Sequence, residues 1–257
     1  MRTYLRIHDG HIDEISGEVV REQPLTVSVN GERFLTLLCS PIKLEALVVG
    51  YLWMEKVIAG LDDVAHLEVS AVDGRADVTL THPVTLPTER ILTSGCGGGI
   101  TFRIDHRLFP RLHSTFRIGA DELAAQMKAL FAAAVHYRAS RGIHGAALSD
   151  GQELLVVAED VGRHNAVDKI KGEAMQRGIT TTDRVLLSTG RVSSEMLLKA
   201  ARMGVPVVAS RTSPTEMAVA LAEQLNITIC GYVRGGNMNL YTGRAVALAG
   251  EPTVSRG

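Results

Sequence analysis

One cysteine of this chain lies in a stretch made largely of glycine. The segment Leu92 to Phe102 reads LTSGCGGGITF, so Cys96 has glycine on both sides. Glycine has no Cβ to pack and loses much conformational entropy on ordering, which favours a loop here. Backbone N–H groups, with Arg90 or Arg103, could lower the pKa of a thiol in such a loop and make it nucleophilic. Composition leaves two interpretations open: a reactive sulfur, or a surface loop that contains a cysteine by chance.

The other two cysteines have different surroundings. Cys39 ends the apolar segment FLTLLC and Cys230 ends NITIC, which predicts two small side chains buried in a core. The three cysteines match no disulfide-framework spacing, which indicates free thiols in a reducing compartment. The cytoplasm is therefore the expected location.

A second set of chemically active residues follows four predicted strands, with one arginine in each loop. Ligands of open α/β sheets bind beyond the carboxyl ends of the strands. Arginine binds phosphate oxygens through paired hydrogen bonds, and helix N-termini add free N–H groups. The pattern therefore predicts a site for a small polyanion, such as a nucleotide or a phosphorylated cofactor. Its candidate residues are Arg163 and His164 in the first loop, Arg191 in the second, Arg211 in the third and Arg234 in the fourth.

An alternative stays open for these residues. Arginines that follow strands also pair with local carboxylates, which here are Glu159, Asp160, Asp168 and Glu195. His164 begins a predicted helix, where a neutral imidazole can cap the helix as well as bind a ligand. The last loop, GYVRGGNMN, adds paired glycines that would let the backbone approach a ligand closely.

Several common kinds of site are missing from the sequence. It has no Cys-x-x-Cys or His-x-x-x-His spacing, and it lacks the zinc-deaminase pattern His-x-Glu…Pro-Cys-x-x-Cys, so no metal site is expected. The phosphate loop G-x-x-x-x-G-K-[ST] is also missing, which argues against ordinary ATP or GTP hydrolysis. The formal net charge is −1 in 257 residues, so no nucleic-acid partner is expected. No apolar run is long enough for a membrane span, so no membrane contact is expected either.

The elements that would position these residues change in kind along the chain. The first half predicts antiparallel hairpins that turn at the Asn-Gly pair of residues 30–31 and at the Asp-Gly pair of residues 73–74. A helix between them is expected to start at an N-cap, Ser40, and to stop at Gly60.

The second half has a different rhythm. It predicts a helix over residues 119–142, a hairpin that turns at residues 150–151, and then repeated strand–loop–helix units. Short apolar strands that alternate with helices indicate a sheet covered on both faces, which is an α/β architecture. The change near residue 118 predicts a smaller N-terminal α+β domain over residues 1–118, ending in the cysteine loop, and an α/β domain over residues 119–257.

Six ordered segments carry a family resemblance that covers nearly the whole chain. They are PLTVSVNGERFLTLLCSPIKLEALVVGYL, SGCGGG, GIHGAAL, EDVGRHNAVDKIKG, LLSTGRVSSEML and GVPVVASRTSPTEMAVALAEQLNITICGYVRGGNMNLYT. Together they resemble the formate dehydrogenase accessory sulfurtransferase family, FdhD, and DVGRHNAVDK is the most specific piece.

The resemblance implies a sulfur carrier that is required for formate dehydrogenase activity. Such a sulfurtransferase accepts persulfide sulfur from a cysteine desulfurase. It passes that sulfur to the molybdenum bis(molybdopterin guanine dinucleotide) cofactor before the cofactor enters formate dehydrogenase. Cys96 matches the persulfide cysteine of the family. The cofactor-binding stretch matches Tyr232, Val233, Arg234, Gly235, Gly236 and Asn237.

The resemblance also implies a C-terminal domain of the cytidine-deaminase type, a three-layer α/β/α arrangement without the deaminase zinc. A homodimer is implied too, with a site that a guanine nucleotide can occupy. Many members of the family have Cys-x-x-Cys in the loop, whereas this chain has Gly99 at the second position. A relay of one sulfur needs one thiol, so this departure bears on a resolving cysteine and not on the carrier. Two other functions stay open: a non-catalytic escort of the molybdenum cofactor, and a nucleotide-processing enzyme on the same scaffold.

Overall fold

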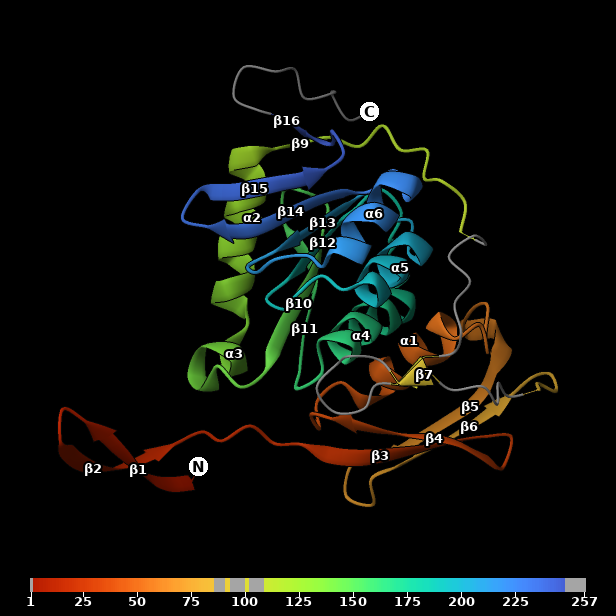
Figure 1. The fold of residues 1–257 in the computed structure, drawn as a ribbon. Coiled ribbons are helices and arrows are strands. Elements are labelled where there is room, and N and C mark those ends of the chain that lie inside the picture. The colour runs from red at the N-terminus through yellow and green to blue at the C-terminus, as the bar shows by residue number, and fades with distance from the viewer. Residues whose placement is uncertain (1, 86–90, 93–99, 102–108, 248–257) are drawn as a thin grey trace.

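The computed structural model describes every residue of the chain except 1, 86–90, 93–99, 102–108 and 248–257. Cys96 therefore lies outside the described residues. Within the described residues the strands form a six-stranded sheet, a four-stranded sheet and three two-stranded sheets (Figure 1).

The six-stranded sheet has the order β11-β10-β12-β13-β14-β15. Strands β12, β13 and β14 are parallel to one another, whereas β10 is antiparallel to both of its neighbours and β15 is antiparallel to β14. The strands span His144–Ser149 (β10), Leu154–Asp160 (β11), Val185–Ser188 (β12), Val207–Ser210 (β13), Thr228–Arg234 (β14) and Asn237–Thr242 (β15).

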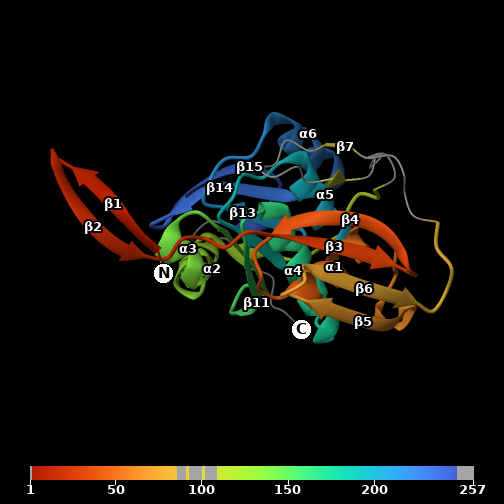
Figure 2. The ribbon, with the colours of Figure 1, turned by 90° about the horizontal axis from the view of Figure 1, so that it is seen from below.

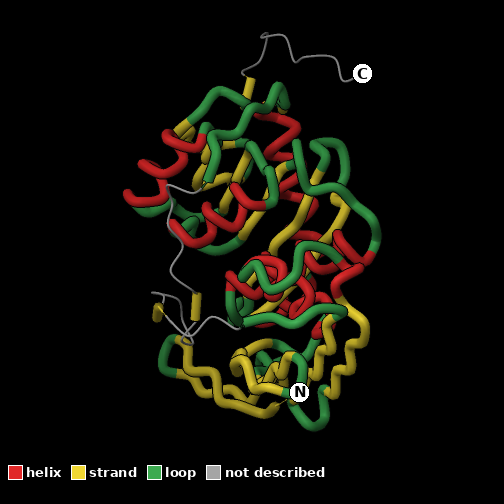
Figure 3. The backbone as a smooth tube through the Cα atoms, turned by 90° about the vertical axis from the view of Figure 1, so that its right-hand side faces the viewer, coloured by secondary structure: helices red, strands yellow, loops and turns green. Residues whose placement is uncertain are grey.

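Helices cover both faces of this sheet (Figures 1 and 3). Helix α2 (Ala120–Ala133) lies on one face, and α4 (Arg163–Gln176), α5 (Ser194–Arg202) and α6 (Glu216–Leu225) lie on the other. Alternate residues of a strand enter different cores, because successive side chains point to opposite faces: Leu187 packs in the α2 core and Leu186 in the other. The predicted mixed α/β fold is confirmed, while the cytidine-deaminase likeness and the domain division at residues 118 and 119 stay predictions.

The four-stranded sheet has the order β4-β3-β6-β5 and lies at the other end of the molecule (Figure 3). Both hairpins that were predicted at Asn-Gly and Asp-Gly pairs are confirmed, and β3 and β6 pair in parallel. The elements span Gln23–Val29 (β3), Glu32–Cys39 (β4), Leu44–Met54 (α1), Leu61–Asp63 (the 3-10 helix η1), Val64–Ser70 (β5) and Arg75–Leu80 (β6).

Helix α1 joins the two sheets because it packs on the four-stranded sheet and also crosses α4. Two glycines permit the crossing. A Cβ at Gly50 would overlap the carbonyl oxygen of Asp168, and a Cβ at Gly172 would overlap that of Ala46. The backbones of α1 and α4 therefore touch directly at this point.

The remaining elements are short or peripheral. Strands β1 and β2 form an N-terminal hairpin that projects from the body below α3 (Figures 1 and 2). These elements span Arg2–His8 (β1), His11–Gly17 (β2), Ile91–Leu92 (β7), Ile100–Thr101 (β8), Ile118–Gly119 (β9), Val135–Ser140 (α3) and Val246–Ala247 (β16).

Helix α1 differs from its prediction at both ends. It begins at Leu44 and ends at Met54, before the predicted glycine stop. The predicted N-cap, Ser40, is engaged elsewhere: its backbone N–H donates to Asp160 Oδ2 over 3.0 Å and its Oγ accepts from Val161 N. A tertiary contact thus overrides the local capping signal.

The single helix predicted over residues 119–142 is also wrong, because the chain breaks at Ala134 into α2 and α3. The Glu159 carboxylate explains the break. It accepts hydrogen bonds from His136 N over 3.2 Å and from Tyr137 N over 2.6 Å. Glu159, which belongs to β11, therefore provides an acceptor for the first N–H groups of α3.

Candidate functional site

The four predicted loops meet at one edge of the six-stranded sheet. Strands β11, β12, β13 and β14 run in the same direction, so their carboxyl ends lie at the same edge of the sheet, with β10 between β11 and β12. Hydrogen bonds join successive loops: Arg211 N donates to Ser188 O over 3.1 Å, and Tyr232 N donates to Thr212 O over 3.0 Å. The predicted convergence of these loops at one edge is confirmed.

Two of the four arginines share a cavity at this edge. Arg234 Nε donates to the carbonyl oxygen of Arg211 over 3.0 Å. Both residues line a cavity of about 440 Å³ between α2 and the end of β14. Its lining contains three cationic side chains and no carboxylate: Ala124, Ala125, Met127, Lys128, Phe131, Arg211, Val233, Arg234, Gly235 and Gly236.

The cavity wall on α2 carries residues that were not predicted. Lys128 and Phe131 lie one helical turn apart, and the Phe131 ring has Arg211 at 4.8 Å and Arg141 at 5.0 Å from its centroid. Arginine over an aromatic face is a favourable contact. The i, i+3 spacing of Lys128 and Phe131 predicts that they share a face of the helix. No signal in the sequence indicates that this face meets β14.

The stretch that matches the family's cofactor-binding residues is a hairpin rather than the predicted loop. Gly235 and Gly236 form its turn with φ of 56° and 85°, and both line the cavity with Val233. Tyr232 is exposed and has φ of 53°, a conformation that costs energy for a bulky residue and that occurs often at functional sites. Tyr232 and Asn237 are not among the cavity-lining residues.

The other predicted residues lie at the same edge but away from this cavity. Arg163 is buried at the start of α4 next to Gly190, where a Cβ would lie 3.1 Å from that of Arg163. His144 Nδ1 would lie 3.0 Å from the same point. Arg191 is exposed in the loop after β12.

His164 is held within the protein through both ring nitrogens. Its Nε2 lies 3.1 Å from Ser193 Oγ and its Nδ1 lies 3.3 Å from Glu195 Oε2. Burial, and then the cations of Lys199 and Arg163, lower the pKa of His164 to about 2. The ring is therefore neutral at pH 7. The capping alternative is wrong, because α4 has Gly162 at its N-cap and no side-chain hydrogen bond there, and the contacts of His164 are to the start of α5. Ligand binding by His164 stays a prediction.

The most specific motif of the sequence, DVGRHNAVDK, has mainly structural contacts. Asp160 Oδ2 accepts from Lys169 Nζ over 2.6 Å and from the Ser40 backbone, while Oδ1 accepts from Gly162 N and from the Asn165 amide. Lys169 Nζ also donates to Ser40 O and Glu159 O. We call these residues the Asp160 cluster. It fastens the end of β4 to the β11–α4 turn.

A second buried pair lies further along α4. Lys199 Nζ contacts both carboxylate oxygens of Asp168, at 2.5 and 2.6 Å. Of the carboxylates considered as arginine partners, Glu159 therefore holds α3, Asp160 holds Lys169, and Asp168 holds Lys199.

Comparison with known proteins identifies the chain. Residues 20–247 match the family model described as FdhD/NarQ. The chain belongs to the FdhD/NarQ family. This confirms the resemblance predicted from the motifs.

The relatives match over nearly their full length. The chain is 38% identical over 248 residues to the sulfur carrier protein FdhD of Bacillus subtilis, covering 94% of this chain and 95% of that one. It is 39% identical over 244 residues to the protein of the same name from Staphylococcus aureus, with coverages of 93% and 92%. The crystal structure of a formate dehydrogenase accessory protein from Desulfotalea psychrophila matches with a TM-score of 0.78 and 26% identity, over 95% of this chain and 96% of that one.

Two of the three cysteines of this FdhD/NarQ chain are core residues, as predicted. Cys39 and Cys230 are both fully buried. Burial, and next the Asp160 carboxylate, raise the pKa of Cys39 to about 12, and burial alone raises that of Cys230 to about 12. Both stay protonated at neutral pH, and a protonated thiol is a poor nucleophile.

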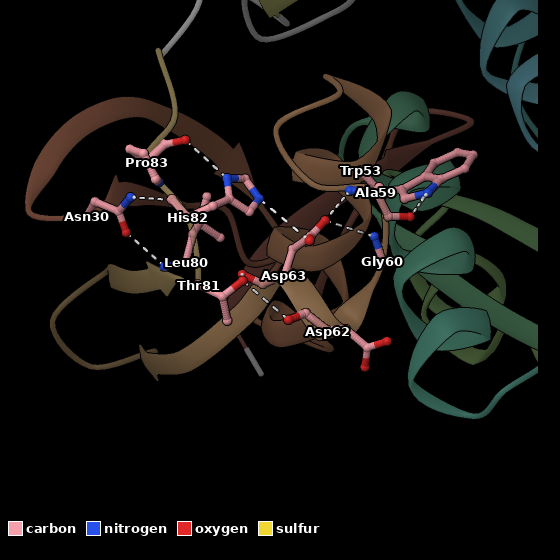
Figure 4. Close-up of polar contacts among 10 residues, drawn as sticks. All are labelled: Asn30, Trp53, Ala59, Gly60, Asp62, Asp63, Leu80, Thr81, His82 and Pro83. Atoms are coloured by element: carbon pink, nitrogen blue, oxygen red, sulfur yellow. Dashed lines mark hydrogen bonds and ion pairs between the residues drawn. The ribbon is translucent and has the colours of Figure 1, made fainter.

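The chain leaves the four-stranded sheet toward Cys96 through a fixed corner, drawn in Figure 4. Asn30 accepts from Leu80 N over 2.8 Å and donates to His82 O. His82 Nε2 lies 3.6 Å from Asp63 Oδ1, and Asp63 Oδ2 accepts from the backbone N–H groups of residues 59 and 60. Those backbone hydrogen bonds lower the pKa of Asp63.

The described residues also show no group of three or more His, Cys, Asp or Glu side chains that could hold a metal ion. In the same part of the chain no helix is both long and apolar enough to cross a membrane.

Proposed function

We propose that this protein carries sulfur as a persulfide on Cys96 and delivers it to a molybdenum cofactor that formate dehydrogenase then receives. The observation that carries the proposal is the match, over more than nine tenths of both chains, to relatives named as sulfur carrier proteins. The buried thiols support the choice of residue, because Cys39 and Cys230 are shielded and Cys96 is the remaining cysteine of the chain.

The loading step exchanges one sulfur–sulfur bond for another. The Cys96 thiolate attacks the terminal sulfur of a persulfide on a cysteine desulfurase. A new bond forms between Cys96 Sγ and that sulfur, the old bond breaks, and the desulfurase cysteine leaves as a thiolate. No net oxidation occurs, so the step needs only a thiolate on Cys96 and access to the partner.

The delivery step needs two electrons. The terminal sulfur of a persulfide is released as sulfide only when its bond to Cys96 Sγ is reduced. We propose that the electrons come from the metal of the incoming substrate or from a thiol reductant. Cys96 then returns to the thiolate and can be loaded again.

The cavity beside α2 is proposed to bind the anionic part of that substrate, a guanine dinucleotide arm. Lys128, Arg211 and Arg234 supply positive charge without a competing carboxylate in the lining. Arg211 Nε is buried and has no hydrogen-bond partner among the described residues, and a phosphate oxygen is the kind of acceptor that satisfies such a group. A free guanine nucleotide would occupy the same cavity. Arg163, His164 and Arg191 remain proposed contacts at the same edge for the rest of the cofactor.

The further assignments rest on the same family match. We propose that a cysteine desulfurase and a formate dehydrogenase are the protein partners. The same match supports a homodimer, a C-terminal domain of the cytidine-deaminase type and action in the cytoplasm.

The substitution Cys96→Ala separates a carrier from an escort. If the protein is a carrier, the Cys96→Ala variant binds the molybdenum cofactor as the wild type does, but formate dehydrogenase stays inactive in cells that have only this variant. An escort without a sulfur step keeps the enzyme active in the same cells. Cys230→Ala is the matched control, since a buried thiol outside the relay is expected to leave activity unchanged.

Titration with a guanine nucleotide tests the cavity separately. Arg234→Gln and Lys128→Gln should each weaken binding about tenfold, the factor that corresponds to about 1.4 kcal/mol for a lost ionic contact. Arg191→Gln is a matched control for the cavity, because Arg191 is exposed and does not line it. Equal losses for all three variants would contradict the assignment to this cavity.

A further inference from the structure

Two cations lie against the ring of the only tryptophan of the chain. Trp53 is the last residue but one of α1. Lys171 Nζ, on α4, is 3.9 Å from the centroid of its ring, and Arg202 Cζ, at the end of α5, is 4.7 Å from it. All three residues are half-buried. We call Trp53, Lys171 and Arg202 the cation patch.

The positive charge of the patch is only partly balanced. Among the described residues, none gives Lys171 Nζ a hydrogen bond or an ion pair, and Arg202 Nη1 donates to the neutral carbonyl group of Met54 over 2.9 Å. Burial, and next the Arg202 cation, lower the pKa of Lys171. Burial also lowers the pKa of Arg202, and the Glu55 carboxylate acts in the opposite direction. In this part of the chain one carboxylate thus opposes two cations, which favours a negatively charged partner.

The ring and the backbone hold the cations in place. Arg202 is bonded to Met54 O, and Trp53 Nε1 donates to Ala59 O over 3.1 Å. Binding to groups that are already ordered loses less conformational entropy than binding that must first order them. Tryptophan and arginine are also the residue types that most often dominate the energy of protein interfaces. The patch therefore has the composition of a protein-binding surface.

The patch is an open surface rather than a pocket. None of its residues lines the cavity beside α2, nor two further cavities of about 590 and 400 Å³ in the described part of the chain. Small ligands such as nucleotides bind mostly in concave sites, whereas protein interfaces spread over broad surfaces. Helices α1, α4 and α5 each contribute one residue to the patch. This shape favours a protein with acidic side chains over a free phosphate.

Polar contacts connect the patch to the corner from which the chain leaves toward Cys96 (Figure 4). Trp53 is bonded to Ala59 O, and Ala59 N donates to Asp63 Oδ2 over 2.6 Å. Asp63 Oδ1 lies 3.6 Å from His82 Nε2, and the chain continues from this corner to Cys96. A protein bound at the patch therefore lies beside the start of the segment that carries Cys96.

We propose that the cation patch is the docking surface for an acidic surface of the protein that donates sulfur. The inference rests on the proposed function, and it adds the face of this protein that the donor contacts and the charge of the donor's own contact surface. Carboxylates of the donor pair with Lys171 and Arg202. Such pairs at the rim of an interface act mainly on the rate of association and on its salt dependence.

The kinetics of sulfur loading on Cys96 test this surface in the full chain. A cysteine desulfurase with free cysteine is one donor, and cysteine persulfide, a small molecule that needs no docking surface, is the other. Mass spectrometry follows the sulfur gained by Cys96. Lys171→Glu and Arg202→Glu should each slow loading from the desulfurase about tenfold at ~20 mM salt, and the difference should fall below about twofold at ~500 mM salt, because salt screens the charges. Loading from cysteine persulfide should not change.

Three control variants show whether charge at the patch causes the effect. Lys171→Arg keeps the cation and should load at the wild-type rate. Lys171→Gln removes the charge without reversing it and should slow loading by an intermediate factor, even if the reversal disturbs the fold. Arg138→Glu reverses an exposed charge on α3, which lies apart from α1 in Figures 1 and 2, and should also load at the wild-type rate. Circular dichroism and the emission of Trp53 show that each variant is folded.

The contrary outcomes separate this inference from the proposed function. Wild-type loading from the desulfurase in both charge-reversal variants at low salt would overturn the docking surface and leave sulfur carriage intact. Equal slowing from both donors would also overturn the docking surface, because the substitutions would then act on Cys96 itself. A wild type that gains no sulfur from either donor would overturn sulfur carriage, and the docking surface with it.

Discussion

Replacing Lys169 by methionine should destabilise the protein strongly. The Lys169–Asp160 pair is 2.6 Å long, and both side chains are completely buried. Removing the lysine leaves the Asp160 charge buried without its cation, and breaking a buried ion pair from one side costs about 3–5 kcal/mol. Lys169 also fastens the carbonyl oxygens of Ser40 and Glu159, which would lose a donor.

The contacts that remain set the expected size of the effect. Asp160 keeps hydrogen bonds from Ser40 N, Gly162 N and the Asn165 amide, at 3.0, 2.8 and 2.9 Å. These donors stabilise the carboxylate. We therefore expect Lys169→Met to lower the free energy of unfolding by about 3 kcal/mol, the lower end of the range for a broken buried ion pair. At about 2–4 °C per kcal/mol for a chain of this size, Tm should fall by about 6–12 °C.

Urea unfolding followed by circular dichroism measures this loss in Lys169→Met, in Asp160→Asn and in the double variant. The double variant should cost less than the sum of the single ones, because it buries no unpaired charge. Lys128→Met is the control, since that lysine is exposed and should change stability by less than about 0.5 kcal/mol. A Lys169→Met loss below about 1 kcal/mol, or strictly additive losses, would refute the role given to the Asp160 cluster.

Three further predictions concern packing and protonation. Gly50→Ala should lower the free energy of unfolding by about 1–3 kcal/mol or more, because its Cβ overlaps the α4 backbone; Gly60→Ala, with open space around it, should change it little in the same urea titration, and equal losses would contradict the close helix crossing. The raised pKa values of Cys39 and Cys230 give stability that is complete below pH 9.0 and is lost as pH rises toward 12. Urea titrations at pH 8 and above should therefore show that the free energy of unfolding falls less with rising pH in Cys230→Ala than in the wild type. An equal fall in both would contradict the raised pKa of Cys230. The lowered pKa of Asp63 gives stability that is present above pH 3.8 and is lost as pH falls through the folded value. In urea titrations below pH 5, the free energy of unfolding of Asp63→Asn should therefore fall less with decreasing pH than that of the wild type. The same fall in both proteins would contradict the lowered pKa.

Local signals predicted much of the fold because they act over a few residues. The Asn-Gly and Asp-Gly turns gave the hairpins, and hydroxyls at Ser193 and Thr215 cap α5 and α6. The N-terminal hairpin was missed although Asp9 and Gly10, with φ of 47° and 79°, carry the same turn signal. The start of α1 could not be predicted because Ser40 is held by residues 120 positions further along the chain.

The site was predictable in part for the same reason. Strand direction places the arginines at one edge, and this follows from the alternation of strands and helices. Which of them share a cavity depends on α2, whose Lys128 and Phe131 reach Arg211 and Arg234 only through tertiary packing. Sequence spacing does not encode that contact.

The most direct test of the central claim is mass spectrometry of the intact protein and its peptides after incubation with a cysteine desulfurase and free cysteine. The account predicts that the Cys96 peptide gains the mass of one sulfur atom, that the peptides of Cys39 and Cys230 do not, and that Cys96→Ala takes up none. An unmodified Cys96 peptide beside a desulfurase that converts cysteine to alanine, or equal loading of the Cys96→Ala chain, would contradict the account.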